Sequence, residues 1–228
     1  MAVRLVYCAS YLTEPGEWRQ DDFATGKFIK AIKGNRDFTG FAKVPVRGNR
    51  LRLDMNNRPL AYTWFGQMAG DYFRQQVSLP QGTTLRVVPL PSSDAVLGTA
   101  FTRFPARDLA NAFCRVAGPS FVMTDVLRWR VAKESASTGS GSRNASVLRE
   151  NLVVAPAAPP GDYMVLDDVC TSGAHLRAAI ARLEEQPGVT VSYALCAGRT
   201  CREPADDPWA IQNEAFDASI PDLSWMFS

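Results

Sequence analysis

The sequence predicts an α/β fold, a parallel sheet with helices on both faces. From residue 82 onward, short apolar runs typical of buried strands alternate with stretches of helical periodicity. Strands that are apolar on both faces are typical of parallel sheets, because crossover helices cover the two faces. With 228 residues, of which 46% are hydrophobic, the chain is long enough to bury a substantial core.

The first 80 residues are predicted to form a smaller amino-terminal region, a hood of helices and a hairpin. We expect a strand at 4–12, a helix at 21–35, a hairpin or exposed irregular segment at 46–59 and a second helix at 60–77. The segment 21–35 has apolar residues at Phe23, Phe28, Ile29 and Ile32, and Gly34-Asn35 is a stop signal, which together predict a helix.

Residues 81–202 are predicted to form the main α/β core. The expected elements are a strand with a Pro- and Ser-rich loop at 83–93, a helix at 106–118, strands at 126–131, 150–155 and 163–169, a helix at 174–188 and a strand at 189–199. Residues 203–228 are expected to be an irregular tail, whose Trp209 and Phe216 either stack on a ligand ring or fold back onto the domain.

Composition limits the classes of partner and compartment. The net charge of +2 gives no general field for nucleic acid, so we do not expect a nucleic-acid partner. Five scattered cysteines without CxxC spacing predict reduced thiols in a cytoplasmic protein. There is no long apolar segment typical of a signal peptide or a membrane span.

The stretch YMVLDDVCTSGAHL, residues 163–176, holds the clearest chemical pattern. An apolar strand ends in adjacent carboxylates, Asp167 and Asp168, and a loop of small residues then leads into a helix. A helix amino terminus offers free N–H groups and a positive dipole end, which suit a phosphate. Carboxylates accept strong hydrogen bonds from vicinal hydroxyls. The pattern therefore predicts a sugar-phosphate site, and the alternative is a structural acidic turn.

Other nucleotide and phosphate sites fit the sequence less well. A P-loop requires GxxxxGK[ST], and ATGKF at 24–28 lacks the first glycine and the final hydroxyl residue. A dehalogenase-like site needs two acids separated by one residue, whereas here they are adjacent. Single-stranded DNA binding has only an unordered set of basic and aromatic residues in its support: Trp18, Arg19, Arg47, Arg50 and Arg52.

The segment LDDVCTSGAHL resembles VDDVITTGATL, the 5-phosphoribosyl-1-diphosphate (PRPP) motif of type I phosphoribosyltransferases. More narrowly, the chain resembles the ComF branch, predicted amidophosphoribosyltransferase-like proteins associated with competence. The likeness runs from about residue 23 to 199: FIKAIKGN, VVPLPSS and RENLVVA resemble other ComF segments in the same order. The resemblance implies a Mg²⁺-dependent transferase of nucleotide metabolism that moves phosphoribosyl from PRPP to a nitrogen nucleophile and releases diphosphate.

The resemblance also implies a role for each matched residue. Asp167 and Asp168 hold the ribose hydroxyls, directly or through Mg²⁺, and the 5-phosphate lies on Cys170, Thr171, Ser172, Gly173, Ala174 and His175. Ser92 and Ser93 face the diphosphate together with Arg128. Residues 128–143 take the place of the mobile catalytic loop, from which Arg130, Lys133 and Arg143 meet the leaving diphosphate. By composition alone, 135–142 is equally a plain solvated loop.

Two departures from the family pattern leave a second function open. His175 stands where the family has Thr or Ser, and the ComF zinc-binding CxxC knuckles are missing. The alternative is a catalytically silent protein that binds PRPP or a nucleotide, or an adaptor in DNA uptake. The acceptor is unassigned, and a homodimer is compatible with either function.

Overall fold

The computed structural model describes residues 2–14, 16–35, 39–80, 82–100, 104–132 and 144–220. Its helices are α1 (Gln20–Lys33), α2 (Leu60–Gln76), α3 (Pro105–Ala117), α4 (Ala145–Asn151) and α5 (Ala174–Glu184). Its strands are β1 (Val3–Tyr7), β2 (Ser10–Leu12), β3 (Ala42–Val46), β4 (Asn49–Leu53), β5 (Leu85–Pro89), β6 (Phe121–Met123), β7 (Leu127–Trp129), β8 (Leu152–Val154), β9 (Gly161–Cys170), β10 (Val189–Cys201) and β11 (Gln212–Phe216).

A mostly parallel sheet lies at the centre of this mixed α/β fold. Its strands are ordered β11-β1-β10-β9-β5-β6, and β2 pairs with the end of β10. All pairs in this sheet are parallel except β1 with β11. This confirms the α/β class with a largely parallel sheet. The predicted strands at 126–131 and 150–155 lie outside it, however, because β7 and β8 pair with each other as a separate antiparallel ribbon.

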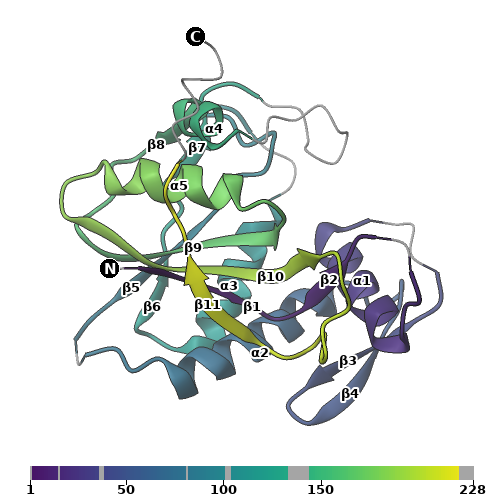
Figure 1. Ribbon diagram of the computed structural model, residues 1–228. Helices are drawn as coiled ribbons and strands as arrows, with labels where there is room; N and C mark the ends of the chain where they lie inside the picture. Colours follow the sequence, from purple (N-terminus) through teal and green to yellow (C-terminus); the bar gives the residue numbers. More distant parts are fainter. Residues whose placement is uncertain are drawn as a thin grey trace.

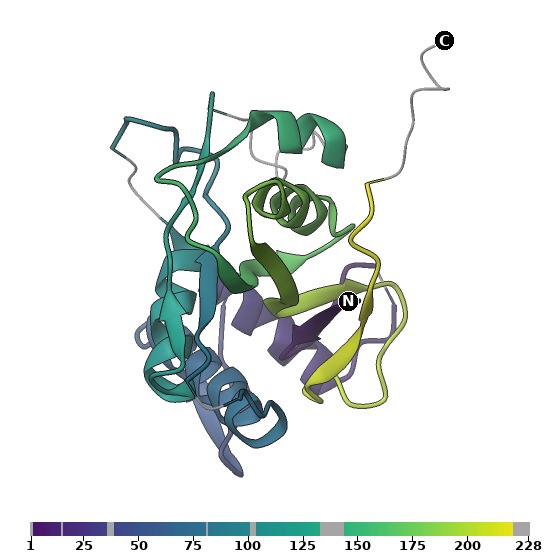
Figure 2. The same cartoon turned by 90° about the vertical axis from the view of Figure 1, so that its left-hand side faces the viewer.

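Two hydrophobic clusters fill the two faces of the sheet. On one face α1, α2 and α3 pack over alternate strand residues such as Val87, Met164 and Leu195. On the other face α4, α5 and the β7–β8 ribbon cover the intervening residues, such as Val88 and Val165. Figure 1 shows α5 on one side of the sheet and α2 and α3 on the other, and Figure 2 shows the same layers from the side.

The expectation of an irregular tail is wrong, because β11 completes the sheet. It pairs antiparallel with β1 at the edge, from Val3↔Phe216 to Tyr7↔Gln212. Most of its side chains are solvent-exposed, so the segment lacks the apolar pattern that marks the central strands. Trp209 does fold back onto the domain, where its ring lies 5.5 Å from that of Phe28.

Phe23 does not share the burial of the other apolar residues named in α1. Its side chain is 52% exposed and packs beside Trp18, with ring centroids 5.1 Å apart. Phe23 lies in the first turn of α1, whereas Phe28 and Ile32, further along the helix, are buried in the hydrophobic cluster.

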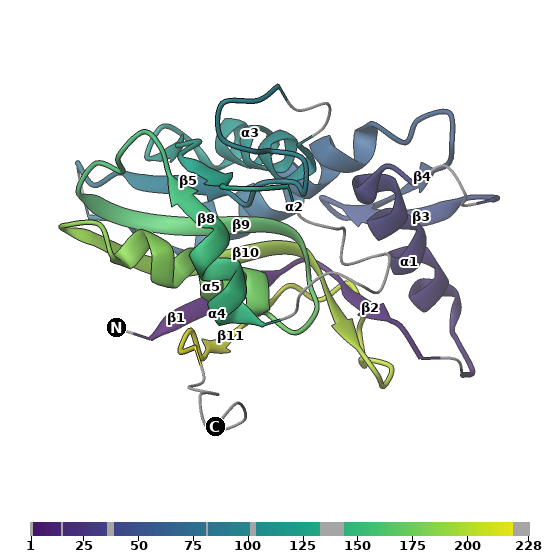
Figure 3. The same cartoon turned by 90° about the horizontal axis from the view of Figure 1, so that it is seen from above.

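The strand order gives the sheet a topological switch point at the carboxyl ends of β5 and β9, where we expect the ligand-binding crevice. From β5 the chain passes through α3 to β6 on one side, whereas β9 pairs with the other side of β5. Such a switch point is where open α/β sheets bind ligands. In Figures 1 and 3, α1 and the β3–β4 hairpin lie at the end of the sheet toward which β10 points.

Because β1 belongs to the main sheet, the amino-terminal region also contributes to the core. The domain boundaries near residues 80 and 202 stay predictions. Within the described ranges, none of the helices is both long and apolar enough to cross a membrane.

Candidate functional site

The acid pair lies on a part of β9 that extends beyond its neighbour β5. The pairing of β5 with β9 ends at Pro89↔Leu166, whereas β9 remains paired with β10 as far as Cys170. The sequence had suggested that the strand ends at the two carboxylates. Asp167 and Asp168 instead lie within β9, which continues to Cys170. The end of β5 leaves one side of this part of β9 without a partner strand, and both carboxylates are half-buried there.

Each carboxylate accepts one hydrogen bond from the backbone N–H of the next residue. Asp168 N–H donates to Asp167 Oδ1 at 2.8 Å, and Val169 N–H donates to Asp168 Oδ1 at 2.7 Å. Among the described residues neither carboxylate forms an ion pair. Two adjacent acids without a cation are expected to repel each other, so the arrangement favours a cation or a hydroxyl donor from outside the chain.

The electrostatic environment of Asp167 is unfavourable to its charge. Burial raises the pKa of this carboxyl well above its usual range, and the neighbouring Asp168 raises it further. The hydrogen bond from Asp168 N–H and the charge of Lys33, in the last turn of α1, act in the opposite direction. Lys33 is thus a positive charge near enough on another element to affect the pKa of Asp167, a neighbour that the sequence did not indicate.

Close packing brings α1 to this end of the sheet. A Cβ on Gly198 of β10 would lie 2.6 Å from Cδ1 of Ile29, so only glycine lets α1 approach the strand this closely. Gly198 pairs with Val169, and one position further along the two strands Arg199 is the register partner of the buried Cys170. The thiol of Cys196 hydrogen-bonds to Cys170 and lowers its pKa, against the effect of burial.

Beyond Cys170 the chain turns through an amide-rich loop into α5. Thr171 and Ser172 are exposed, and Gly173 is the N-cap of α5 with φ +77°, a left-handed conformation that favours glycine. The backbone amides of Thr171, Ser172 and Gly173 donate no hydrogen bond within the described part of the structure. These amides and the positive end of α5 make the loop suitable for an anion.

A buried tryptophan joins this loop to the loop that follows β5. The indole Nε1–H of Trp129 donates to the Pro91 carbonyl at 3.1 Å, and its ring lies 6.2 Å from that of His175 in an edge-on contact. Ser92 and Ser93 follow Pro91 directly, so the two predicted binding loops lie on adjacent strands and share Trp129 as a support. The Ser92 hydroxyl donates to Asp94 at 2.6 Å.

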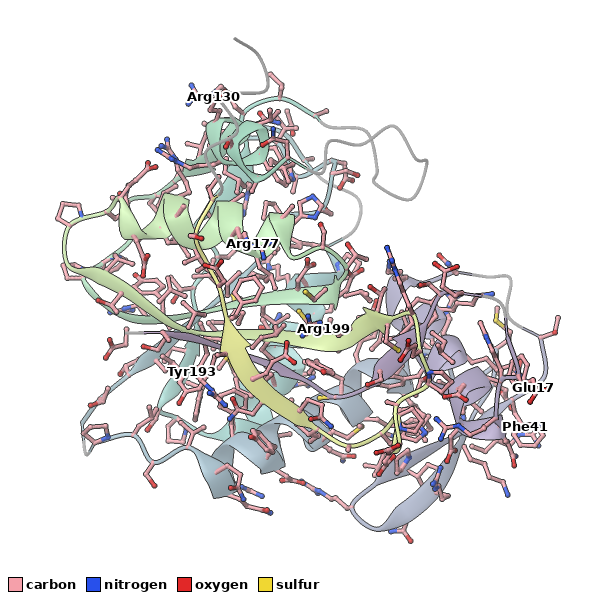
Figure 4. All side chains as sticks on the ribbon, in the orientation of Figure 1. Glu17, Phe41, Arg130, Arg177, Tyr193 and Arg199 are labelled. Carbon is pink, nitrogen blue, oxygen red and sulfur yellow. The ribbon has the colours of Figure 1, made fainter. Side chains whose placement is uncertain are left out.

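The structure describes two of the four predicted Arg and Lys partners of the diphosphate, Arg128 and Arg130. Arg128 binds Asp125 in a half-buried ion pair, with Nη2 to Oδ2 at 3.0 Å. Arg130 lies beside α4 in Figure 4, apart from Arg177 and Arg199. Lys133 and Arg143 fall outside the described residues. The structure therefore brings together the acids, residues 170–175 and the serine loop. The contacts of Arg128 and Arg130 with the diphosphate stay predictions.

Comparison with known proteins gives little support to any one family. No protein-family model matches the sequence, and no curated protein matches it significantly. Among solved structures, a hypoxanthine phosphoribosyltransferase from Staphylococcus aureus aligns with a TM-score of 0.35 and 10% identity, over 62% of this chain and 74% of that one. A similarity this low carries no argument about activity, so the inferences below rest on the geometry of the crevice.

The raised pKa of Asp167 predicts a specific pH dependence of stability. The folded protein binds more protons than the unfolded chain between about pH 4, the value for unfolded Asp, and the raised folded value. Stability therefore falls as pH rises through this window. Because Asp167→Asn removes this effect, the free energy of unfolding of the variant relative to the wild type should increase with pH and then level off. Denaturant unfolding of both proteins across pH checks this; a pH-independent difference would contradict it.

Proposed function

We propose that this protein binds a sugar phosphate in the crevice beyond β5 and β9, and that it is a phosphoribosyltransferase. The observation that carries the proposal is the continuity of residues 167–173. Two half-buried carboxylates that form no ion pair among the described residues lead, within a few residues, to a loop at the start of a helix whose backbone N–H groups donate no hydrogen bond in the described structure. One ligand with hydroxyls at one end and a phosphate at the other satisfies both groups.

Each end of the ligand has a distinct partner in this proposal. The 5-phosphate accepts hydrogen bonds from the amides of 171–173 and from the hydroxyls of Thr171 and Ser172, with the positive end of α5 behind them. The ribose hydroxyls donate to Asp167 and Asp168, and these charge-assisted bonds are about twice as strong as neutral ones. Ser92 and Ser93, on the neighbouring loop, face the diphosphate of PRPP.

The acid pair also fits Mg²⁺. Carboxylate oxygens are the ligands that Mg²⁺ prefers, and the ion commonly takes one or two carboxylates and completes its shell with substrate oxygens and water. The Oδ1 atoms of Asp167 and Asp168 accept hydrogen bonds from backbone N–H groups, which leaves Oδ2 of each acid for a cation. The described residues hold no group of three or more His, Cys, Asp or Glu side chains that could bind a metal ion, so in this proposal substrate oxygens and water complete the shell. When bound, Mg²⁺ neutralises charge on the diphosphate.

The proposed reaction substitutes a nitrogen nucleophile for diphosphate at C1 of the ribose. A nitrogen lone pair forms the new C1–N bond, the C1–O bond breaks, and its electron pair leaves with the diphosphate. The nitrogen then loses a proton to solvent. Asp167 and Asp168 orient the ring by its hydroxyls, and the loop at 171–173 fixes its phosphate end, so that C1 meets the acceptor in one geometry. Arg130 and Lys133 stay predicted partners of the diphosphate, and the acceptor is a nucleobase or an amine.

Release of diphosphate tests the reaction. We expect purified protein with PRPP and Mg²⁺ to release diphosphate with at least one member of a panel of nucleobases, amines and ammonia. The coupled diphosphate assay should report a rate that depends on both the acceptor and Mg²⁺. Ser172→Ala, which keeps the loop but removes one hydroxyl, should raise the KM for PRPP. No release above the background of PRPP hydrolysis with any acceptor would exclude the transferase.

A second function, binding without turnover, is favoured by one observation. Asp94 accepts the Ser92 hydroxyl at 2.6 Å, which places a carboxylate in the loop proposed to face the diphosphate. A negative side chain there opposes an anionic leaving group. Calorimetry distinguishes the two functions: tight binding of PRPP or a nucleotide without diphosphate release favours the silent binding protein over the enzyme.

A further inference from the structure

The loop at 171–173 is covered by the carboxyl-terminal segment of the described chain. The ring of Phe216, the last residue of β11, lies against Gly173, and a Cβ built on that glycine would lie 3.0 Å from two ring atoms. Phe216 is 9% exposed, and Ala218 and Ile220 after it pack on the same hydrophobic cluster as α5. The segment 216–220 is therefore a packed part of the fold beside this loop.

One arginine of α5 links that segment to the loop. Arg177 Nη1–H donates to the Ser172 carbonyl at 2.8 Å, and Arg177 Nε–H donates to the Asp217 carbonyl at 2.9 Å. Its guanidinium also lies over the Phe216 ring, 5.2 Å from the centroid. Only the planar fork of an arginine offers two donors in a fixed geometry while stacking on a ring.

A second arginine connects β11 to the base of the same loop. Arg199 of β10 is the register partner of Cys170, lies 5.8 Å from the Tyr7 ring centroid and forms an ion pair with Glu214 of β11. Arg177 and Arg199 both lower the pKa of Cys170, as nearby positive charges do. Figure 4 labels Arg177 on α5 and Arg199 on β10, on the side of the molecule where β11 lies.

We propose that β11 and residues 217–220 form a brace that fixes the shape of the phosphate-binding loop, and that Arg177 is its positioning residue. The brace rests on the proposed function of the loop, and it adds what gives the loop its affinity. Thr171 and Ser172 are exposed, and their backbone N–H groups donate no hydrogen bond within the described structure. Contacts made by other residues must therefore hold the loop in the shape that binds the phosphate. Holding a binding loop in its bound shape before the ligand arrives lowers the entropic cost of binding.

Ribose 5-phosphate titrations by calorimetry, with Mg²⁺ present, test the brace. Arg177→Gln and Phe216→Ala should each weaken binding by about tenfold or more, because several hydrogen bonds or a packed ring are lost. Arg177→Lys should weaken it nearly as much, since the single Nζ of lysine cannot take the places of the two separate nitrogens, Nε and Nη1, that bond the two carbonyls. In the protein without ligand, hydrogen exchange of the amides at 171–173 should be faster in all three variants than in the wild type.

A matched control separates the brace from a general loss of stability. Val3→Ala truncates the register partner of Phe216 on the same cluster, and Val3 is not among the nearest neighbours of a Cβ on Gly173, which belong to Phe216 and Arg177. It should lower the melting temperature and leave the affinity for ribose 5-phosphate unchanged. If Arg177→Gln and Phe216→Ala bind ribose 5-phosphate as tightly as the wild type, the brace is overturned while the proposed function stands. Wild-type affinity in Arg177→Lys would also overturn the brace, because the positive charge would then be the cause. If the wild type itself fails to bind, the proposed function falls and the brace with it.

Discussion

The variant that combines Asp167→Asn with Asp168→Asn should lose the thermal shift that PRPP and Mg²⁺ produce in the wild type. Each carboxylate supplies charge-assisted hydrogen bonds worth about 1.5–3 kcal/mol. Removing both should therefore weaken binding by a factor on the order of 100 or more. The fold should survive, because the asparagine Oδ1 accepts the same backbone N–H groups that now bind Asp167 and Asp168. Differential scanning fluorimetry, with and without ligand, measures both effects.

Asp162→Asn is the matched control for the acid pair. Asp162 is an exposed carboxylate on the same strand, near the opposite end of β9. This variant should keep the full ligand-induced shift, so a general change in charge is excluded as the cause. If the double variant unfolds without ligand, the acids are structural; if it binds as the wild type does, they do not hold the ligand.

The second large effect is expected for Gly173→Ala. At φ +77° an L-residue is strained, at a cost of about 1–2 kcal/mol. Its Cβ would also lie 3.0 Å from the Phe216 ring, so the loop or the ring must shift. We expect lower stability together with at least a tenfold loss of affinity for ribose 5-phosphate, because the displaced amides no longer converge on the phosphate. Urea unfolding and calorimetry measure the two quantities.

Gly188→Ala provides a control with similar strain away from the crevice. Gly188 lies in the turn between α5 and β10 and has φ +71°. A Cβ on Gly188 would lie 3.0 Å from Pro160. Its substitution should reduce stability by a comparable amount and leave ligand affinity intact. Equal losses of affinity in both variants would show that binding follows global stability and not the shape of the loop.

The sequence predicts the central elements well because their burial is encoded locally. Apolar runs such as 163–166 and the helical stripe of α5 have a periodicity that survives in the fold, so the sheet and the strand–loop–helix unit of the candidate site could be predicted. The β11 strand could not, because at a sheet edge only Phe216 of its five residues is buried. Backbone pairing with β1 forms this strand, and such pairing leaves little trace in composition.

The same reason limits what the sequence indicates about the site. Residues 167–175 are contiguous, and their proximity needs no tertiary information. The contacts of Arg177 with Asp217 and of Trp129 with Pro91, and the effect of the Lys33 charge on Asp167, join segments about 40 to 130 residues apart. Arg128 pairs with Asp125 three residues away, a partner that the sequence analysis did not single out, and its contact with diphosphate stays a prediction.

The most direct measurement is a crystal structure with ribose 5-phosphate and Mg²⁺ bound. A single pentose phosphate should span the crevice, with its phosphate on the amides of Thr171, Ser172 and Gly173 and its hydroxyls, or the metal, on Asp167 and Asp168. Density for the sugar at another surface, or a phosphate on the loop with the carboxylates turned away from the ring, would contradict the claim that both groups serve one ligand.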